Sequence, residues 1–199
     1  NNLEDISSLF KEIAKAGKAG AISIAKVMAH GELMSTRLGA AYLENSGIDV
    51  EWRDARTDLI AKKSDTGNSD RDILSASCNY DADDRLIKEF SSYPEKAIIT
   101  QGFIASDPSG NTVLLGRGGS DVSASYFAAK LGAEVCEIWT DVPGMYTANP
   151  KQIPSARLIR ELDYDEAQEI ASFGAKVLHP KCLAPVRRQK IPLKIFCLD

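Results

Sequence analysis

The sequence has no long hydrophobic run, little histidine and no excess of positive charge. No apolar stretch approaches the roughly 20 residues that span a bilayer. The opening residues NNLED lack the basic and apolar regions of a secretory signal. The 24 Lys and Arg are outnumbered by 28 Asp and Glu, which gives a net charge of -4, so no basic field favours nucleic acid. We therefore expect neither a membrane nor a nucleic-acid partner.

Cysteine and histidine are too scattered to indicate a disulfide framework or a zinc site. The four cysteines form no C-x-x-C pair, and the two histidines lie far from any paired cysteines. Isolated thiols are typical of a reducing compartment, and we expect a cytoplasmic protein. With 199 residues, of which 44% are hydrophobic, the chain is long enough for one domain with a sizeable core.

Hydrophobic periodicity predicts helices that alternate with short strands. Helical spacing predicts helices over residues 2–16, 21–30, 32–45, 83–90, 121–131, 163–172 and 180–189. Strands are predicted over residues 48–52, 97–100, 135–139 and 193–197, and a hairpin joins 103–104 to 112–115. Residues 54–80 are polar and irregular, and 97–100 is apolar enough for a buried parallel strand. This alternation indicates an α/β fold with a mainly parallel sheet.

The most informative motif is GRGGSD at residues 116–121. Its glycines allow a tight turn and a close approach to a ligand, and the helix that follows offers free N–H groups to an anion. Arg117 can hold a carboxylate through two parallel hydrogen bonds. The alternative is a plain strand-to-helix turn with Asp121 as the N-cap. A dinucleotide-binding oxidoreductase is disfavoured, because Asp121 stands where G-x-G-x-x-G has its last glycine.

Three other segments carry groups suited to charged ligands. In TDVPGMY, residues 140–146, Asp141 could meet ribose or, indirectly, magnesium, and Tyr146 could pack on a base; both are also ordinary loop residues. In FGAKVLHP, residues 173–180, Lys176 could neutralise phosphate oxygens during transfer, whereas His179 is expected to be a structural hydrogen-bonding residue. Glu32 either pairs with a helix dipole or accepts a substrate ammonium group.

Five segments, in this order, resemble the aspartokinases of the amino acid kinase family. They are residues 31–36 (GELMST), 100–104 (TQGFI), 115–121 (LGRGGSD), 139–144 (WTDVPG) and 173–180 (FGAKVLHP). The resemblance implies one partial, N-terminally truncated catalytic domain over residues 1–199, folded as a three-layer αβα sandwich with a mainly parallel central sheet. It also implies phosphorylation of the side-chain carboxylate of L-aspartate by MgATP, the first step of lysine, threonine and methionine synthesis.

The resemblance further implies an aspartate pocket and a homo-oligomeric full-length protein. By similarity, Arg117 would hold the α-carboxylate of L-aspartate and Glu32 would hold its ammonium group. Ser120 and Asp121 would complete the pocket, with Asp121 also catalytic.

A nucleotide site is implied as well, with ATP and Mg²⁺ as cofactors and no dedicated protein ligands for the metal. By similarity, Thr140, Asp141 and Tyr146 would contact the nucleotide, and Lys176 would contact its phosphates as a second catalytic residue. Lys151 stands where the family often has arginine, which keeps the charge but loses the two-pronged grip of a guanidinium.

One family feature is missing from the sequence. Family members begin with a strand that bears Lys-Phe-Gly-Gly, which contacts the transferred phosphoryl group, and no segment here matches it. We therefore expect the chain as given to be a fragment that is inactive or weakly active. A non-catalytic ligand-binding or regulatory module on the same fold remains an alternative to the kinase.

Overall fold

A computed structural model describes residues 2–63, 67, 69–93, 96–172 and 177–197. In chain order the regular elements are α1 (Asn2–Ala16), α2 (Ala21–Asn45), β1 (Val50–Trp52), η1 (Ala55–Thr57), α3 (Ser69–Leu74), α4 (Asp84–Phe90), β2 (Ala97–Ile99), β3 (Ile104–Ser106), β4 (Thr112–Leu114), α5 (Gly119–Leu131), β5 (Cys136–Thr140), α6 (Tyr164–Ser172), η2 (Pro180–Cys182), α7 (Leu183–Arg188) and β6 (Leu193–Cys197). Across these ranges, no helix combines the length and the apolar character needed to cross a membrane.

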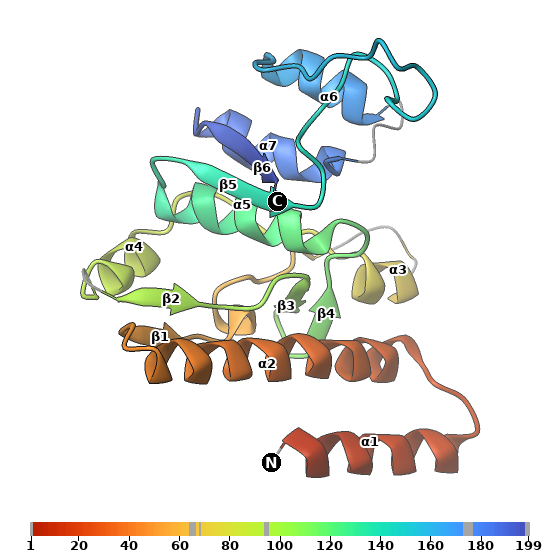
Figure 1. Ribbon diagram of the computed structural model, residues 1–199. Coiled ribbons are helices and arrows are strands. Elements are labelled where there is room, and N and C mark those ends of the chain that lie inside the picture. The colour runs from red at the N-terminus through yellow and green to blue at the C-terminus, as the bar shows by residue number, and fades with distance from the viewer. Residues whose placement is uncertain (1, 64–66, 68, 94–95, 173–176, 198–199) are drawn as a thin grey trace.

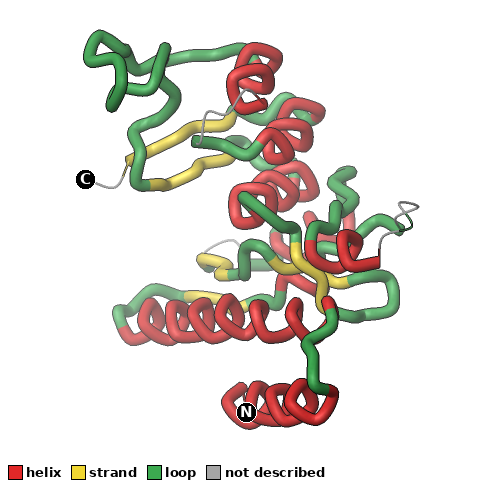
Figure 2. The backbone as a smooth tube through the Cα atoms, turned by 90° about the vertical axis from the view of Figure 1, so that its right-hand side faces the viewer, coloured by secondary structure: helices red, strands yellow, loops and turns green. Residues whose placement is uncertain are grey.

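The strands form three pairs, two of them parallel. β1 pairs with β2 and β5 pairs with β6 in parallel, whereas β3 and β4 form an antiparallel hairpin. Helix α2 lies on one side of strands β1 to β4, and α5 lies on the other side (Figure 1). The β5–β6 pair, α7 and α6 lie beyond α5, and the view in Figure 2 keeps this order. The α/β class with mainly parallel strand pairing is confirmed.

The core is centred on α5, which is buried on most of its surface. Val122 and Ala129 of α5 are fully buried, and the helix packs against α4, α7 and β5. A helix covered on several sides carries apolar or small residues on several faces, in contrast to a surface helix with one apolar stripe. The buried Ser123 and Ser125 hydroxyls of α5 donate to carbonyl groups of the same helix. Burial raises the pKa of Cys78 and Cys182 in this core to about 12, so these thiols are protonated packing groups.

Helix α2 corrects one prediction from the sequence. The sequence predicted two helices that meet at Gly31, but α2 is a single helix of 25 residues. Glycine costs only about 1 kcal/mol in a helix interior. The small buried residues Ala25, Ala29 and Ala40, with Leu33 between them, lie on both sides of Gly31 and continue one packed face through it. Tertiary packing therefore outweighs the local signal.

Two smaller predictions and one alternative from the sequence are wrong, and one predicted helix is correct in extent but divided in two. Strand β2 is parallel but is exposed or half-buried along its length, and α3 lies within the segment predicted to be irregular. The helix predicted over residues 180–189 is divided into the 3-10 helix η2 and α7. Asp121 is not an N-cap, because α5 begins at Gly119 and Gly118 caps it. The Asp163 cap is confirmed: the Asp163 N–H donates to Glu166 Oε2 over 3.1 Å.

Candidate active site

The glycine-rich turn is enclosed by residues from distant parts of the chain. Gly116 and Gly118 have φ angles of 77° and 68°, in the left-handed region that favours glycine. A Cβ atom at Gly116 would lie 2.6 Å from Ser75 Oγ, and one at Gly118 would lie 2.5 Å from His179 Cβ. Protein groups therefore lie against this turn on two sides, and the close approach to a ligand stays a prediction.

A second segment, residues 102–103, packs against the first turn of α5. A Cβ atom at Gly102 would lie 3.0 Å from Ser120 Oγ. The backbone of Phe103, with φ of 70°, donates its N–H to Ser123 Oγ over 2.9 Å and to Gly119 O over 3.3 Å. A bulky residue with positive φ is strained and persists only where its surroundings fix it. Residues 102–103 are therefore held firmly against the start of α5.

The turn of α2 that carries Glu32 is tied to the same segment through Thr36. The Thr36 hydroxyl donates to the backbone oxygen of Glu32 over 2.8 Å and accepts from Gln101 Nε2 over 2.8 Å. Burial raises the pKa of the half-buried Glu32 carboxyl above its ordinary value. Two predicted parts of the aspartate pocket, Glu32 and the 116–121 turn, thus belong to one connected region.

Charges at the turn act on one another. Arg117 and Ser120 are exposed, whereas Asp121 is half-buried. Burial raises the pKa of Asp121, and the charge of nearby His179 opposes that rise. Burial also lowers the pKa of His179, with the nearby cations Lys181 and Arg117 adding to the effect. Arg117 is thus an exposed cation at this turn, and a guanidinium group suits a carboxylate ligand.

His179 has the structural role predicted for it. Its ring nitrogen Nδ1 accepts the Lys181 backbone N–H over 3.2 Å at the start of η2. The Lys181 ammonium in turn donates to Ser75 Oγ over 3.3 Å. His179, Lys181 and Ser75 thus enclose Gly116 and Gly118 as one unit.

Four of the residues predicted to bind nucleotide belong to a second segment, which runs from the end of β5 to residue 151. The Thr140 hydroxyl, at the end of β5, donates to Asp141 Oδ1 over 3.1 Å, and Asp141 is exposed. Tyr146 is half-buried and forms an isolated antiparallel bridge with Leu158. Lys151 is exposed, so its ammonium is accessible to a phosphate. Lys176 falls outside the described residues, and its role stays a prediction.

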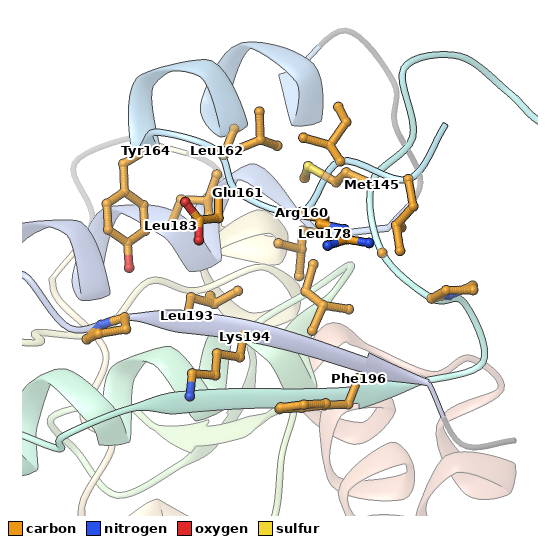
Figure 3. Close-up of a pocket in the computed structure, with 17 residues that line it drawn as sticks. Met145, Arg160, Glu161, Leu162, Tyr164, Leu178, Leu183, Leu193, Lys194 and Phe196 are labelled. Atoms are coloured by element: carbon orange, nitrogen blue, oxygen red, sulfur yellow. The ribbon is translucent and has the colours of Figure 1, made fainter. Parts of the chain in front are cut away.

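A cavity of about 730 Å³ is lined in part by residues 143–145 of this second segment. Its walls come from residues 143–145, 158–162, 164 and 167, from Leu178 and Leu183, and from 192–196 of the β6 strand region. Figure 3 shows Leu162, Leu178 and Leu193 around it, together with the charged side chains of Glu161 and Lys194. Residues 143–145 and Leu178 belong to two of the sequence motifs, but the motifs did not predict the cavity, because its other walls come from segments far apart in the sequence.

Sequence reasoning also missed Ser75 and Gln101 as residues that contact the region of Glu32 and the glycine-rich turn. Ser75 lies in a polar stretch with no motif, and only its position beside Gly116 reveals it. Gln101 stands within the TQGFI segment, but its type alone assigned it no role. Within the described ranges, no group of three or more His, Cys, Asp and Glu side chains is placed to hold a metal ion.

The glycine-rich turn and the segment after β5 lie on a fold that is shared by one family of enzymes. Residues 2–197 match the Amino acid kinase family. The chain belongs to that family.

Within the family, the chain is similar to aspartokinases. It is 39% identical over 190 residues to the bifunctional aspartokinase/homoserine dehydrogenase of Haemophilus influenzae, covering 96% of this chain and 22% of that protein. It is 38% identical over 195 residues to the lysine-sensitive aspartokinase 3 of Escherichia coli, covering 96% of this chain and 42% of that protein. The chain thus spans less than half the length of these relatives.

A solved structure supports the same placement. The crystal structure of E. coli aspartokinase III in complex with aspartate and ADP superposes with a TM-score of 0.83 at 36% identity. The superposition covers 98% of this chain and 42% of that one. These likenesses favour a kinase over the non-catalytic module.

Proposed function

We propose that this protein is an aspartate kinase that transfers the γ-phosphoryl group of ATP to the side-chain carboxylate of L-aspartate. The product is 4-phospho-L-aspartate, formed in the first step of lysine, threonine and methionine synthesis. The observation that carries the proposal is the connection of the Glu32 turn to the enclosed glycine turn that bears Arg117. An acidic group and a cationic group on one site match the ammonium and carboxylate groups of an amino acid.

Within this proposal, the aspartate pocket uses opposite charges at its two sides. Arg117 is exposed at the rim and holds the α-carboxylate through paired N–H donors. Glu32 accepts the ammonium group, and binding of that cation offsets the cost of keeping a half-buried carboxylate ionised. Ser120 and Asp121, at the start of α5, complete the pocket, and Asp121 is also assigned a catalytic role.

The nucleotide is assigned to the segment after β5. Thr140, Asp141 and Tyr146 are assigned to the nucleoside part, and Lys151 and Lys176 are assigned to its phosphates. Mg²⁺ is typically bound by one or two carboxylates together with substrate phosphates, and exposed Asp141 is compatible with that pattern. When bound with ATP, the ion offsets the negative charge of the phosphates.

The reaction needs positioning and charge compensation but no covalent enzyme intermediate. A side-chain carboxylate oxygen of aspartate forms a bond to the γ-phosphorus, and the bond from that phosphorus to the β–γ bridging oxygen breaks, which releases ADP. Both reactants are anions, so cationic side chains must offset their repulsion while the two groups are held in line. Arg117, Lys151 and Lys176 supply that charge in the proposal.

The cellular location, the oligomeric state and the small-molecule partners of the protein are part of the same proposal. We assign it to the cytoplasm, where the buried thiols Cys78, Cys136 and Cys182 would stay reduced. We also assign it to a homo-oligomer. Its small-molecule partners are L-aspartate and MgATP.

Trapping of the acyl phosphate tests the proposed reaction. The complete gene product and the 199-residue chain are incubated with MgATP, hydroxylamine and either L-aspartate or L-glutamate, and the hydroxamate is measured. We expect an aspartate-dependent signal from the gene product and little or none with glutamate. Arg117→Ala should weaken aspartate binding at least 10-fold, consistent with loss of a charge-assisted hydrogen bond. Arg117→Lys should recover part of that loss.

The same assay separates the kinase from a non-catalytic module. Absence of hydroxamate from a gene product that still binds aspartate and ADP in calorimetry would overturn the kinase and favour the ligand-binding module. A signal of equal size with glutamate would overturn the assigned substrate. Activity of the 199-residue chain by itself would show that Lys-Phe-Gly-Gly is dispensable.

A further inference from the structure

Gln101 is a buried polar residue whose three hydrogen bonds reach two separate segments, helix α2 and residues 53–55. It is 1% exposed. Its side-chain oxygen accepts the Ala55 backbone N–H over 2.9 Å, and its nitrogen donates to Thr36 Oγ1 over 2.8 Å and to Arg53 O over 3.3 Å. The site therefore requires a donor and an acceptor on one side chain, which a carboxylate or a thioether cannot supply together. The position therefore favours an amide for its hydrogen-bonding groups, and a side chain of similar volume without those groups would not replace it.

Thr36 carries this connection to Glu32. A hydroxyl has one proton to donate and two lone pairs to accept with. Thr36 donates to Glu32 O over 2.8 Å and accepts from Gln101 Nε2 over 2.8 Å and Trp52 Nε1 over 3.1 Å. The whole capacity of the hydroxyl is used. The turn of α2 that presents the Glu32 carboxyl is therefore bonded to Gln101 through one atom.

The backbone next to Gln101 leads to the other half of the pocket. The following residue, Gly102, lies so close to Ser120 that an added Cβ would stand 3.0 Å from Ser120 Oγ. Phe103 then bonds to Ser123 and Gly119 in the first turns of α5. A displacement of Gln101 would thus be transmitted to Ser120, because the intervening residue has no free space.

We propose that Gln101 is a positioning residue that sets the separation between Glu32 on α2 and the Arg117–Ser120 turn. The inference rests on the proposed function, since it concerns the aspartate pocket of that enzyme. Gln101 touches no reacting group and acts through Thr36 on one side and through Gly102 on the other. Loss of Gln101 should weaken aspartate binding more than nucleotide binding, because Thr140 and Asp141 lie on a different segment, at the end of β5 and just after it.

Two substitutions at Thr36 give a matched test. Thr36→Val keeps the shape but removes the hydroxyl, whereas Thr36→Ser keeps the hydroxyl and loses a methyl group. Dissociation constants for aspartate and for ADP are measured by calorimetry on the complete gene product, with a thermal melt for each variant. We expect Thr36→Val to weaken aspartate binding about 5-fold or more, the scale of a lost buried hydrogen bond. ADP binding should change less than about 2-fold, and Thr36→Ser should bind aspartate nearly as well as the wild type.

Gln101→Met provides a second, independent variant of similar volume. It should also weaken aspartate binding selectively, and combining it with Thr36→Val should add little, because the two residues act through one connection. Equal weakening of aspartate and ADP binding, or a loss of melting temperature with no change in either constant, would reduce Gln101 to a structural role. Should Gln101→Met not fold, the Thr36 pair decides alone. A wild-type protein that binds ADP but not aspartate would instead refute the proposed function.

Discussion

The two ends of helix α5 have the same backbone conformation in different surroundings. Both caps are glycines in the left-handed region, Gly118 with φ of 68° and Gly132 with φ of 61°. In the described part of the chain, no atom lies within 4 Å of a Cβ built on Gly132, whereas one on Gly118 would lie 2.5 Å from His179 Cβ. Gly132 therefore serves only to end a helix, while Gly118 also admits a neighbouring segment. The same residue type thus has a local role at one end and a long-range role at the other.

The carboxyl groups at the two ends also differ. Burial raises the pKa of Asp121 in the first turn of α5. Near the last turn, the Lys130 ammonium lies 3.1 Å from Asp83 Oδ2. Burial would raise the pKa of Asp83, but its hydrogen bonds with the Leu86 N–H and with Lys130 hold it below the ordinary value. The site end of α5 thus disfavours its charged carboxylate, and the far end stabilises one.

Gly118→Ala should have the largest effect, because it adds a clash to backbone strain. We expect it to lower the free energy of unfolding by about 2–5 kcal/mol, from left-handed strain of roughly 1–2 kcal/mol plus overpacking of roughly 1–3 kcal/mol. Urea denaturation measures the loss. A cost no greater than that of Gly132→Ala would show that His179 moves aside freely and would remove the contrast between the two ends.

Lys130→Met should have the next largest effect and tests the far end. Lys130 is 8% exposed, and its removal should cost about 1–3 kcal/mol, the scale of a hydrogen bond to a charged group. Asp83 has a lowered pKa in the folded state, so its contribution is present above its unfolded pKa of about 3.9. That contribution is lost as the pH falls through the folded pKa. The variant and the wild type should therefore converge in stability in acid.

A matched lysine provides the control for that measurement. Lys88, in α4, is exposed, and Lys88→Met should change the free energy of unfolding by less than about 0.5 kcal/mol at every pH. A pH-independent loss in Lys130→Met would mean that packing of the lysine stem, and not its charge, stabilises this end.

Gly132→Ala should cost about 1 kcal/mol, from left-handed strain alone. Thermal unfolding of this variant beside Gly118→Ala isolates the contribution of the neighbouring segment, since the φ angles are nearly equal. Aspartate binding should be unchanged in Gly132→Ala. If binding weakened there as well, α5 would respond as a whole and its two ends could not be separated.

Asp121→Asn should have the smallest effect on stability, and its sign is the informative quantity. Because the folded-state pKa of Asp121 is raised, the folded protein binds more protons than the unfolded chain between the two pKa values. Its stability therefore falls as the pH rises from about 3.9 through the folded pKa. The neutral amide escapes this loss, so the variant should be slightly more stable than the wild type at pH 7 and not below pH 4. Lower stability at pH 7 would indicate that helix-dipole attraction outweighs burial.

Features set by neighbours in the chain could be predicted from the sequence. The Asp107 carboxylate accepts the backbone N–H groups of Ser109 and Asn111, so the hairpin turn is fixed by residues within it. The Asp163 and Glu166 cap is equally local. The break predicted at Gly31 was wrong for the opposite reason: packing on both sides of it, through Ala29 and Leu33, decided the outcome.

The candidate site could be predicted only in part. The glycine motif indicated a close approach to a ligand, whereas in the structure Ser75 and His179, 41 and 61 positions away in sequence, lie against Gly116 and Gly118. Gln101 likewise reaches Thr36 across 65 positions. Periodicity and spacing describe a single segment, and they contain no information about which distant segment will pack against it.

The unbroken course of α2 has a mechanical consequence. At 1.5 Å per residue, its 25 residues make a stiff rod about 37 Å long, with Glu32 near the middle and Asn45 at one end. A helix interrupted at Gly31 could bend there, so that a displacement of one half would not be transmitted to the other half. A continuous rod instead passes a tilt at its Asn45 end directly to the carboxylate. Any force that shifts the far end of α2 would therefore move the Glu32 carboxyl, to which the proposed function assigns the substrate ammonium group, with no hinge between the two.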